Sequence, residues 1–373
     1  MKQKIYGVIP PISTPIDEHE HVDEKALRKL IDHCIDKGLH GIFVCGTNGE
    51  CLGLTQAERN RAIKITLDQV AGRVPVLAGC MDTSTARVID NIKAFEQMGG
   101  QTAVVTPEFY SRHSTPDETI RHFEQVAKHT EADIFIYNIP PFTGNTMSPK
   151  AVFEMATFDH IVGYKDTSGQ FGDFLRCLNH FRGTDFMLFQ GMTQLAGVSL
   201  LMGADGFIPN ISPVVPELCL KVYDYAKAGD IEKLKVYCEL LLEAQDSFSN
   251  AKYGIAACKA ACSMLGFMDQ RMCQPSEPVT PEQKESIAPE RSHIITVYRE
   301  LQARRWHAED LQPLFAKLGE ENTGRTLVAV AALEQVGLIT AADRGGAKFW
   351  ELVPATGKKN LADAPILKCL EER

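Results

Sequence analysis

A lysine at the end of a short apolar segment is the residue of this chain that points most directly to chemistry. Residues 161–164 (IVGY) precede Lys165, and the polar residues 166–168 (DTS) follow it. A lysine that is buried loses basicity from its ordinary pKa of about 10.4, and its free amine then attacks carbonyl carbons to form an imine. The alternative is a lysine at a strand end whose ammonium reaches water or pairs with Asp166, which is the usual state of a single lysine.

Two sequence periods alternate over the first 230 residues. Amphipathic helical patterns such as 23–37, 55–70, 83–98 and 116–128 alternate with short apolar segments that we expect to be strands. These segments lie at residues 6–12, 41–45, 74–80, 102–106, 133–137, 161–165, 186–190 and 205–208. Eight strands in strict alternation with eight helices predict an α/β fold, the (β/α)8 TIM barrel. An open doubly wound sheet is the alternative, but no GxGxxG follows the first strand.

The remaining chain predicts two further units. We expect residues 1–230 to form the barrel and residues 231–304, which are mainly helical, to form a C-terminal helical extension of it. In residues 308–373, two short helical patterns precede two strand-like segments with a turn between them. This order resembles a small α+β winged-helix-like module. Its charges are nearly balanced, whereas a winged helix that reads DNA carries a basic face, so a role in protein contact or assembly is favoured.

Composition and charge narrow the class of protein further. The 373 residues are 44% hydrophobic and 23% charged, as in ordinary globular proteins, and the net charge of −9 argues against general binding of nucleic acid. The chain begins without an apolar signal core, and none of its apolar runs has the length of a membrane span. The eleven cysteines form no CxxC pair. We therefore expect a cytoplasmic protein with reduced thiols and no metal site.

Polar and reactive residues follow the predicted strands at their carboxyl ends, where barrels of this class carry their active sites. Tyr137 ends the fifth strand, next to Lys165 on the sixth, and is suitably placed as a general acid/base. Residues 46–50 (GTNGE) follow the second strand. Their glycines leave backbone N–H groups free to hold a carboxylate, and Thr47 adds a hydroxyl. Taken singly, Tyr137 is equally well a core tyrosine and Thr47 an ordinary turn residue, but the set as a whole favours a lysine nucleophile.

Four motifs occur in order on the expected strands, namely residues 46–50 (GTNGE), 137–140 (YNIP), 163–167 (GYKDT) and 203–206 (GADG), with Asn210 and Pro213 after the last. With them, residues 5–300 resemble the dihydrodipicolinate synthase / N-acetylneuraminate lyase family of pyruvate-handling class I aldolases. The resemblance implies a barrel with a helical extension, assembled as a homo-oligomer, usually a tetramer built as a dimer of dimers. It also implies a covalent imine on Lys165 without any cofactor, and Tyr137 as the acid/base.

The resemblance further implies a binding site for pyruvate. Thr47 and the amide of Asn48 would hold its carboxylate, and the backbone of Ile208 would lie near the imine. A relay tyrosine reaches the site from a neighbouring subunit in the synthases, from a Thr-Pro-Tyr-Tyr stretch. Residues 106–110 read TPEFY here, so Tyr110 takes that role only if the loop shifts by one residue.

Departures from the family pattern bear on the second substrate. The synthases carry an arginine, which grips the carboxylate of the aldehyde substrate, where this chain has Phe142, and a second threonine where it has Asn48. Loss of such a clamp disfavours the synthase reaction. Sialic acid lyases carry an Asp-Glu pair after the strand-seven glycine, whereas residues 192–194 are MTQ here. Asp166, Thr167 and Gln194 are expected to bind hydroxyls of a polyol chain, beside Gly191 and Phe142 in the substrate site.

These observations predict a lyase, a Schiff-base aldolase that cleaves or forms a 2-keto-3-deoxy sugar acid or a hydroxy-oxoacid. Pyruvate is one partner of the reaction and an aldehyde the other. The alternatives are 4-hydroxy-tetrahydrodipicolinate synthase or N-acetylneuraminate lyase activity, through the same imine. A third reading is a non-enzymatic sensor or regulatory protein, in which the barrel serves the C-terminal module.

Overall fold

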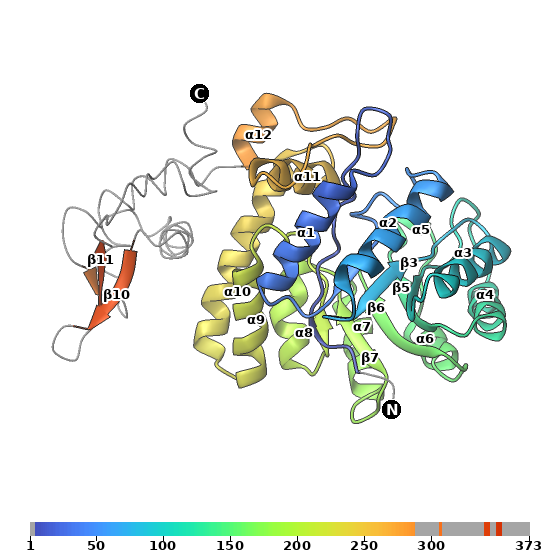
Figure 1. Ribbon diagram of the computed structural model, residues 1–373. Coiled ribbons are helices and arrows are strands. Elements are labelled where there is room, and N and C mark those ends of the chain that lie inside the picture. Colours follow the sequence, from blue (N-terminus) through green and yellow to red (C-terminus); the bar gives the residue numbers. More distant parts are fainter. Residues whose placement is uncertain (1–3, 288–305, 308–338, 344–347, 353–373) are drawn as a thin grey trace.

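A computed structural model describes residues 4–287 and three short strands beyond them, at 306–307, 339–343 and 348–352. Eight of its strands form one sheet, in which every neighbouring pair is parallel. They are β1 (Gly7–Val8), β2 (Ile42–Val44), β3 (Val76–Gly79), β4 (Thr102–Val105), β5 (Asp133–Asn138), β6 (Ile161–Asp166), β7 (Met187–Gln190) and β8 (Gly206–Phe207). Figure 1 shows these strands surrounded by helices.

The strand order is β1-β8-β7-β6-β5-β4-β3-β2, so β1 and β2 are the two edges of the sheet. A parallel bridge between Pro11 and Phe43 joins the segment after β1 to β2. Two backbone hydrogen bonds support it, from Phe43 N to Pro10 O at 2.9 Å and from Ile12 N to Phe43 O at 3.0 Å. The edges therefore meet, as in the predicted barrel.

A helix follows each of the eight strands, as strict alternation requires. These helices are α1 (Glu24–Asp36), α2 (Gln56–Val70), α3 (Thr85–Gln97), α4 (Pro116–His129), α6 (Pro149–Met155), α7 (Phe171–His180), α8 (Ala196–Leu201) and α9 (Pro216–Ala228). The short helix α5 (Pro140–Thr143) precedes α6, and a 3-10 turn (Thr193–Leu195) precedes α8. A capping box stands at Thr115, at the start of α4. At the start of α2, the Thr55 side chain accepts from Glu58 N and caps the helix. The Glu58 carboxylate accepts from Val22 N and not from the backbone of Thr55, so this cap is not a capping box.

Apolar side chains fill two layers of the barrel. The inner cluster lies between the strands and includes Phe43, Phe135, Phe189 and Ile208. The outer cluster lies between the strands and the helices. Because neighbouring residues of a strand point to opposite faces, the two layers alternate along each strand, and polar residues at the strand ends divide between them in the same way.

The chain continues after the barrel units with α10 (Ile231–Asp246), a 3-10 turn (Ser247–Asn250), α11 (Gly254–Met264) and α12 (Pro281–Ile287). Figure 1 shows α11 beside α1, at the same side of the molecule as α9 and α10. Lys29 of α1 donates to Gly266 O just after α11, at 2.7 Å. The segment after α11 thus contacts the first barrel unit, while α10 packs against α9.

The strands β10 (Ile339–Asp343) and β11 (Lys348–Leu352) pair antiparallel, and β9 (Trp306–His307) pairs with β11. Their hairpin lies where the sequence predicts one. The two helices that a winged-helix-like module needs, expected in 309–336, lie outside the described residues, so this module and the division into three domains remain predictions.

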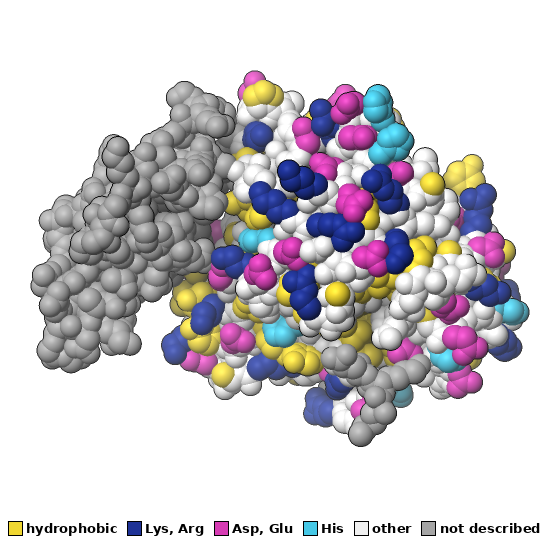
Figure 2. Space-filling model, in the orientation of Figure 1, with side chains coloured by type: hydrophobic (Ala, Val, Ile, Leu, Met, Phe, Trp, Pro, Cys, Tyr) yellow, Lys and Arg dark blue, Asp and Glu magenta, His cyan; other side chains and the backbone are white. Residues whose placement is uncertain are grey.

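Lys/Arg and Asp/Glu side chains are interspersed over the described face drawn in Figure 2, without a broad patch of one sign on that face. None of the described helices is long and apolar enough to span a membrane.

Candidate active site

Lys165 lies inside the barrel, on β6, and only 5% of its surface is exposed. Its Nζ is 4.0 Å from the centre of the Tyr137 ring and 5.0 Å from that of Phe43, and it has no ion-pair partner among the described residues. Burial lowers the pKa of Lys165 to about 7. About half of the amine is therefore uncharged at neutral pH, and the pairing with Asp166 that a strand-end lysine would make is not formed.

Tyr137 stands in register with Lys165 on the neighbouring strand β5, and its side chain is buried in the inner cluster. Burial raises the pKa of its phenol to about 12, an effect that the hydroxyls of Thr167 and Thr47 partly offset. The phenol therefore keeps its proton at neutral pH. Its ring lies against the amine and its hydroxyl lies beside those of Thr167 and Thr47, so it can pass a proton to or from a group bound at Lys165.

The loop that follows β2 turns tightly at residues 46–50. Gly49 N donates to Gly46 O at 3.0 Å, and Glu50 N donates to Thr47 O at 3.1 Å. The amides of Thr47 and Asn48 donate to no acceptor among the described residues. A side chain at Gly46 would come within 2.8 Å of the Phe43 ring, so glycine lets this backbone approach the interior. The turn thus has two amides with which it can hold an anion.

The side chain of Asn48 faces the protein rather than open space. Its Nδ2 donates to Pro11 O at 3.2 Å and to Asn210 O at 3.3 Å, and it contacts Cys258 Sγ at 3.5 Å. These contacts hold the loop, and the amide of Asn48 is the group that remains for a ligand.

Gly191 lies close to the side chain of Lys165. A Cβ at Gly191 would fall 2.0 Å from Thr167 Oγ1 and 3.1 Å from Lys165 Cε, so glycine leaves room at this point for the hydroxyl of Thr167 beside the lysine. Ile208 is buried in the inner cluster, and its N donates to Gln190 O at 2.8 Å. Thr167 Oγ1 is buried beside the phenol and makes no hydrogen bond of ordinary length and angle with the described residues. The structure therefore brings five of the predicted site residues together, those at positions 47, 137, 165, 167 and 191.

Asp166 lies on the opposite face of β6 from Lys165. Its carboxylate accepts from Tyr164 OH at 2.8 Å, from Asn138 Nδ2 at 2.9 Å and from Ser168 Oγ at 3.0 Å. Burial raises its pKa, and these hydrogen bonds oppose that rise. The strand alternation that puts Lys165 inside therefore turns Asp166 toward the helices, and the structure does not bring it to the amine.

Phe142 and Tyr110 lie at the surface of the chain. Phe142, on α5 just after β5, is 62% exposed, and Tyr110 is 98% exposed. Tyr110 has a φ of +78°, a left-handed conformation that a bulky residue adopts only where its surroundings enforce it. Neither ring contacts the buried amine within a single chain.

The loop that carries Tyr110 is fixed at both ends. Asn145 Nδ2 donates to Glu108 O at 2.6 Å, and His113 N donates to Asn145 Oδ1 at 2.8 Å. The Glu108 carboxylate pairs with His113 and with His122, at 2.9 and 3.1 Å. Burial alone would raise the pKa of Glu108, but the hydrogen bond and charge of His122 lower it to about 2. Tyr110 is thus presented outward by an anchored loop.

Thr106 and Lys259 are two further polar residues at this end of the barrel, and neither was among the site residues predicted from the sequence. Thr106 follows β4 one residue after the Val105–Ile136 pair, so its side chain faces Tyr137, and its buried Oγ1 has no hydrogen-bond partner among the described residues. Its position at the end of a predicted strand is the sequence feature that could have identified it. Lys259 is fully buried in α11, and the signal was a lysine inside the apolar run 255–262 (IAACKAAC).

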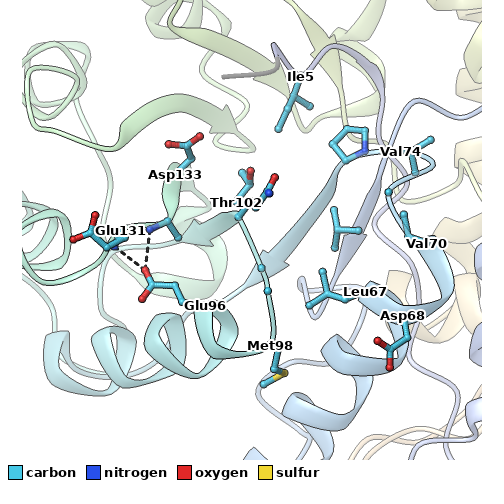
Figure 3. Close-up of a pocket in the computed structure, with 17 residues that line it drawn as sticks. Ile5, Leu67, Asp68, Val70, Val74, Glu96, Met98, Thr102, Glu131 and Asp133 are labelled. Atoms are coloured by element: carbon cyan, nitrogen blue, oxygen red, sulfur yellow. Dashed lines mark hydrogen bonds between the residues drawn. The ribbon is translucent and has the colours of Figure 1, made fainter. Parts of the chain in front are cut away.

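A cavity of about 900 Å³ lies at the other end of the barrel, where β3, β4 and β5 begin. Figure 3 shows Glu96 there, accepting from the backbone N of Glu131 and Ala132. The reactive groups lie instead at the carboxyl ends of the strands, so this cavity is not their site. Among the described residues, no group of three or more His, Cys, Asp or Glu side chains is arranged to hold a metal ion.

Eight parallel strands alternating with helices, with polar groups gathered at their carboxyl ends, define an enzyme of the α/β-barrel class. The model of the Dihydrodipicolinate synthetase family matches residues 4–296. The chain belongs to this family and is a lyase.

Relatives and solved structures agree with this assignment. The 4-hydroxy-tetrahydrodipicolinate synthase of Methanopyrus kandleri is 33% identical over 242 residues, 64% of this chain and 80% of that protein. That of Thermus thermophilus is 32% identical over 286 residues, 75% of this chain and 93% of that protein. The crystal structure of the prophage protein YagE from E. coli K12, in complex with pyruvate, is 26% identical, with a TM-score of 0.74 over 78% of this chain and 99% of that one.

Replacement of Lys165 by methionine should stabilise the fold while removing the amine. The unfolded lysine binds a proton up to a pH of about 10.5, whereas the folded one loses it near 7, so the folded state is destabilised below pH 10.5. At about 1.4 kcal/mol per pKa unit, Lys165→Met should gain roughly 4 kcal/mol at pH 7. Urea unfolding should show this gain, and it should shrink as the pH rises toward 10.

The exposed Lys150 supplies the control, since Lys150→Met should change the free energy of unfolding by no more than about 0.5 kcal/mol at either pH. A Lys165→Met gain that is absent at pH 7, or that stays constant with pH, would contradict a desolvated amine.

Proposed function

We propose that the protein is a class I aldolase that binds pyruvate as an imine on Lys165. The observation that carries the proposal is the buried amine itself, whose pKa burial lowers to about 7 and which faces the neutral phenol of Tyr137. A pyruvate carboxylate would accept from the free amides of Thr47 and Asn48. Its C2 carbon would then face Lys165 Nζ, with the backbone of Ile208 beside the imine.

The bonds change in a simple order in the cleavage direction. Nζ adds to C2 of the oxo acid, the resulting carbinolamine loses water, and a protonated imine forms. In that dehydration Tyr137 gives its proton to the leaving hydroxyl of the carbinolamine and becomes a phenolate. The phenolate then takes the proton of the C4 hydroxyl, directly or through Thr47, the C3–C4 bond breaks, and the electron pair moves onto the imine nitrogen. The aldehyde leaves, the enamine takes a proton at C3, and water releases pyruvate and the free amine.

Tyr110 is proposed to complete the proton relay in a neighbouring copy of the chain. Its ring is 98% exposed, its backbone is held in a left-handed conformation, and its loop is fixed at both ends. These features suit a side chain that is presented to another subunit. A homodimer or homotetramer is accordingly part of the proposal, as is a cytoplasmic location. For residues 308–373 we propose an assembly role.

The second substrate is proposed to be a neutral polyhydroxy aldehyde, so that the oxo acid is a 2-keto-3-deoxy sugar acid or a hydroxy-oxoacid. The side chain of Phe142 is 62% exposed beside the site. Because it is apolar, it supplies no positive charge that could bind a second carboxylate. The buried hydroxyl of Thr167 lies beside the phenol and makes no hydrogen bond of ordinary geometry with the described residues, so it remains as a binding group for a substrate hydroxyl. The names of the relatives support a second candidate, 4-hydroxy-tetrahydrodipicolinate synthase, whose substrate is aspartate semialdehyde.

Borohydride reduction in the presence of pyruvate tests the imine. We expect the wild-type protein to gain the mass of one reduced pyruvate adduct, which peptide mapping should place on Lys165, because burial leaves a large fraction of that amine unprotonated at neutral pH. Lys165→Met is the blank. A screen for pyruvate release over keto-deoxy sugar acids then identifies the substrate. An adduct on another lysine, or none at saturating pyruvate, would refute the proposal.

Phe142→Arg separates the two candidates. A guanidinium at this rim position adds a charged hydrogen bond to a substrate carboxylate, so kcat/KM for aspartate semialdehyde should rise about tenfold relative to a neutral aldehyde. Phe142→Leu is the matched control and should leave the ratio unchanged. If the wild-type protein already prefers aspartate semialdehyde and the arginine adds nothing, the synthase candidate is the better one.

A further inference from the structure

A buried ion pair connects the helical extension to the loop after β2. Lys259 of α11 has no exposed side-chain surface, and its Nζ contacts the carboxylate of Glu50, whose side chain is 6% exposed. Lys259 Nζ also donates to Arg271 O at 2.6 Å, and Glu50 Oε2 accepts from Cys273 N at 2.9 Å. Both charges are thus satisfied by groups from three separate segments of the chain.

A second contact joins the same helix to the same loop. Cys258, the residue before Lys259, accepts from Asn48 Nδ2 at 3.5 Å and donates to Asn210 O at 3.2 Å. Consecutive residues of α11 therefore hold positions 48 and 50 of the loop. Thr47, whose hydroxyl faces Tyr137, lies immediately before these two anchor points.

An ion pair in a protein interior is a poor source of net stability, because removing two charges from water offsets most of their attraction. Such a pair instead fixes the relative position of the two side chains, because separating them leaves each buried charge without its partner, which is strongly unfavourable. Glu50 has a φ of +51°, so the backbone of the loop is strained at this anchor. The pair is thus suited to hold the loop in one conformation.

We infer that Lys259 and Glu50 are positioning residues, which fix the amides of Thr47 and Asn48 for the carboxylate of the oxo acid. The inference rests on the proposed function and extends the site to the helical extension. Without the pair, the loop would sample other conformations. Pyruvate would bind more weakly, while the Lys165 amine would react unchanged once pyruvate is bound.

The test uses the full-length double variant Glu50→Gln/Lys259→Met, in which neither partner leaves an unpaired charge in the interior. Borohydride trapping is measured against pyruvate concentration. The concentration for half-maximal trapping should rise at least about tenfold, within the hundredfold that a misplacement of about 1 Å can cost. The maximal rate and its pH midpoint should match those of the wild type. Amide exchange of peptides containing residues 46–50 should be faster in the variant, with no substrate present.

Lys227→Met is the control, because Lys227 is an exposed lysine of α9 that also donates to a backbone oxygen, Ala204 O at 2.7 Å. It should change neither readout. Unaltered pyruvate dependence together with unaltered exchange in the double variant overturns the inference, as does the same change in the control. If the wild type forms no adduct, the proposed function fails, while the exchange of residues 46–50 still decides whether the pair positions the loop.

Discussion

The desolvation of one ammonium group is the constraint on which this site depends. An unpaired charge is very unfavourable in an apolar interior. Lys165 stays buried, and its ammonium therefore loses a proton near neutral pH. The aromatic faces of Phe43 and Tyr137 enclose the amine, and no carboxylate among the described residues restores its charge. The fold pays for this arrangement in stability, as is common for functional sites.

The barrel supplies this environment through register and alternation. Parallel pairing sets Tyr137 beside Lys165, and the two-residue period of β6 separates the amine from Asp166 by the thickness of the sheet. Glycine at position 191 leaves room for the hydroxyl of Thr167 beside the lysine. The loop at residues 46–50 adds free amides, and α11 holds that loop by a buried ion pair and a thiol contact. The helical extension is thus part of the site as well as of the core.

Local patterns were enough to predict the eight strands and the alternating helices, because each depends on residues close in sequence. The order of strands in a barrel then predicts that Tyr137 lies beside Lys165. The direction of a side chain at a strand end was harder to infer. Asp166 was expected to bind substrate, but the register of β6 turns it toward Tyr164. Lys259 was missed because its partner, Glu50, is more than two hundred residues away. A charged residue in an apolar helix was the clue that a distant partner must exist.

The central claim, that burial makes Lys165 lose its proton near pH 7, is tested most directly by titrating its Nζ. Protein labelled with 15N at lysine can be followed by NMR from pH 5 to about 11, with Lys165→Met identifying the resonance. The account predicts a midpoint near pH 7, well apart from the other lysines. A Lys165 resonance that keeps the chemical shift of the protonated amine up to about pH 10 would contradict it.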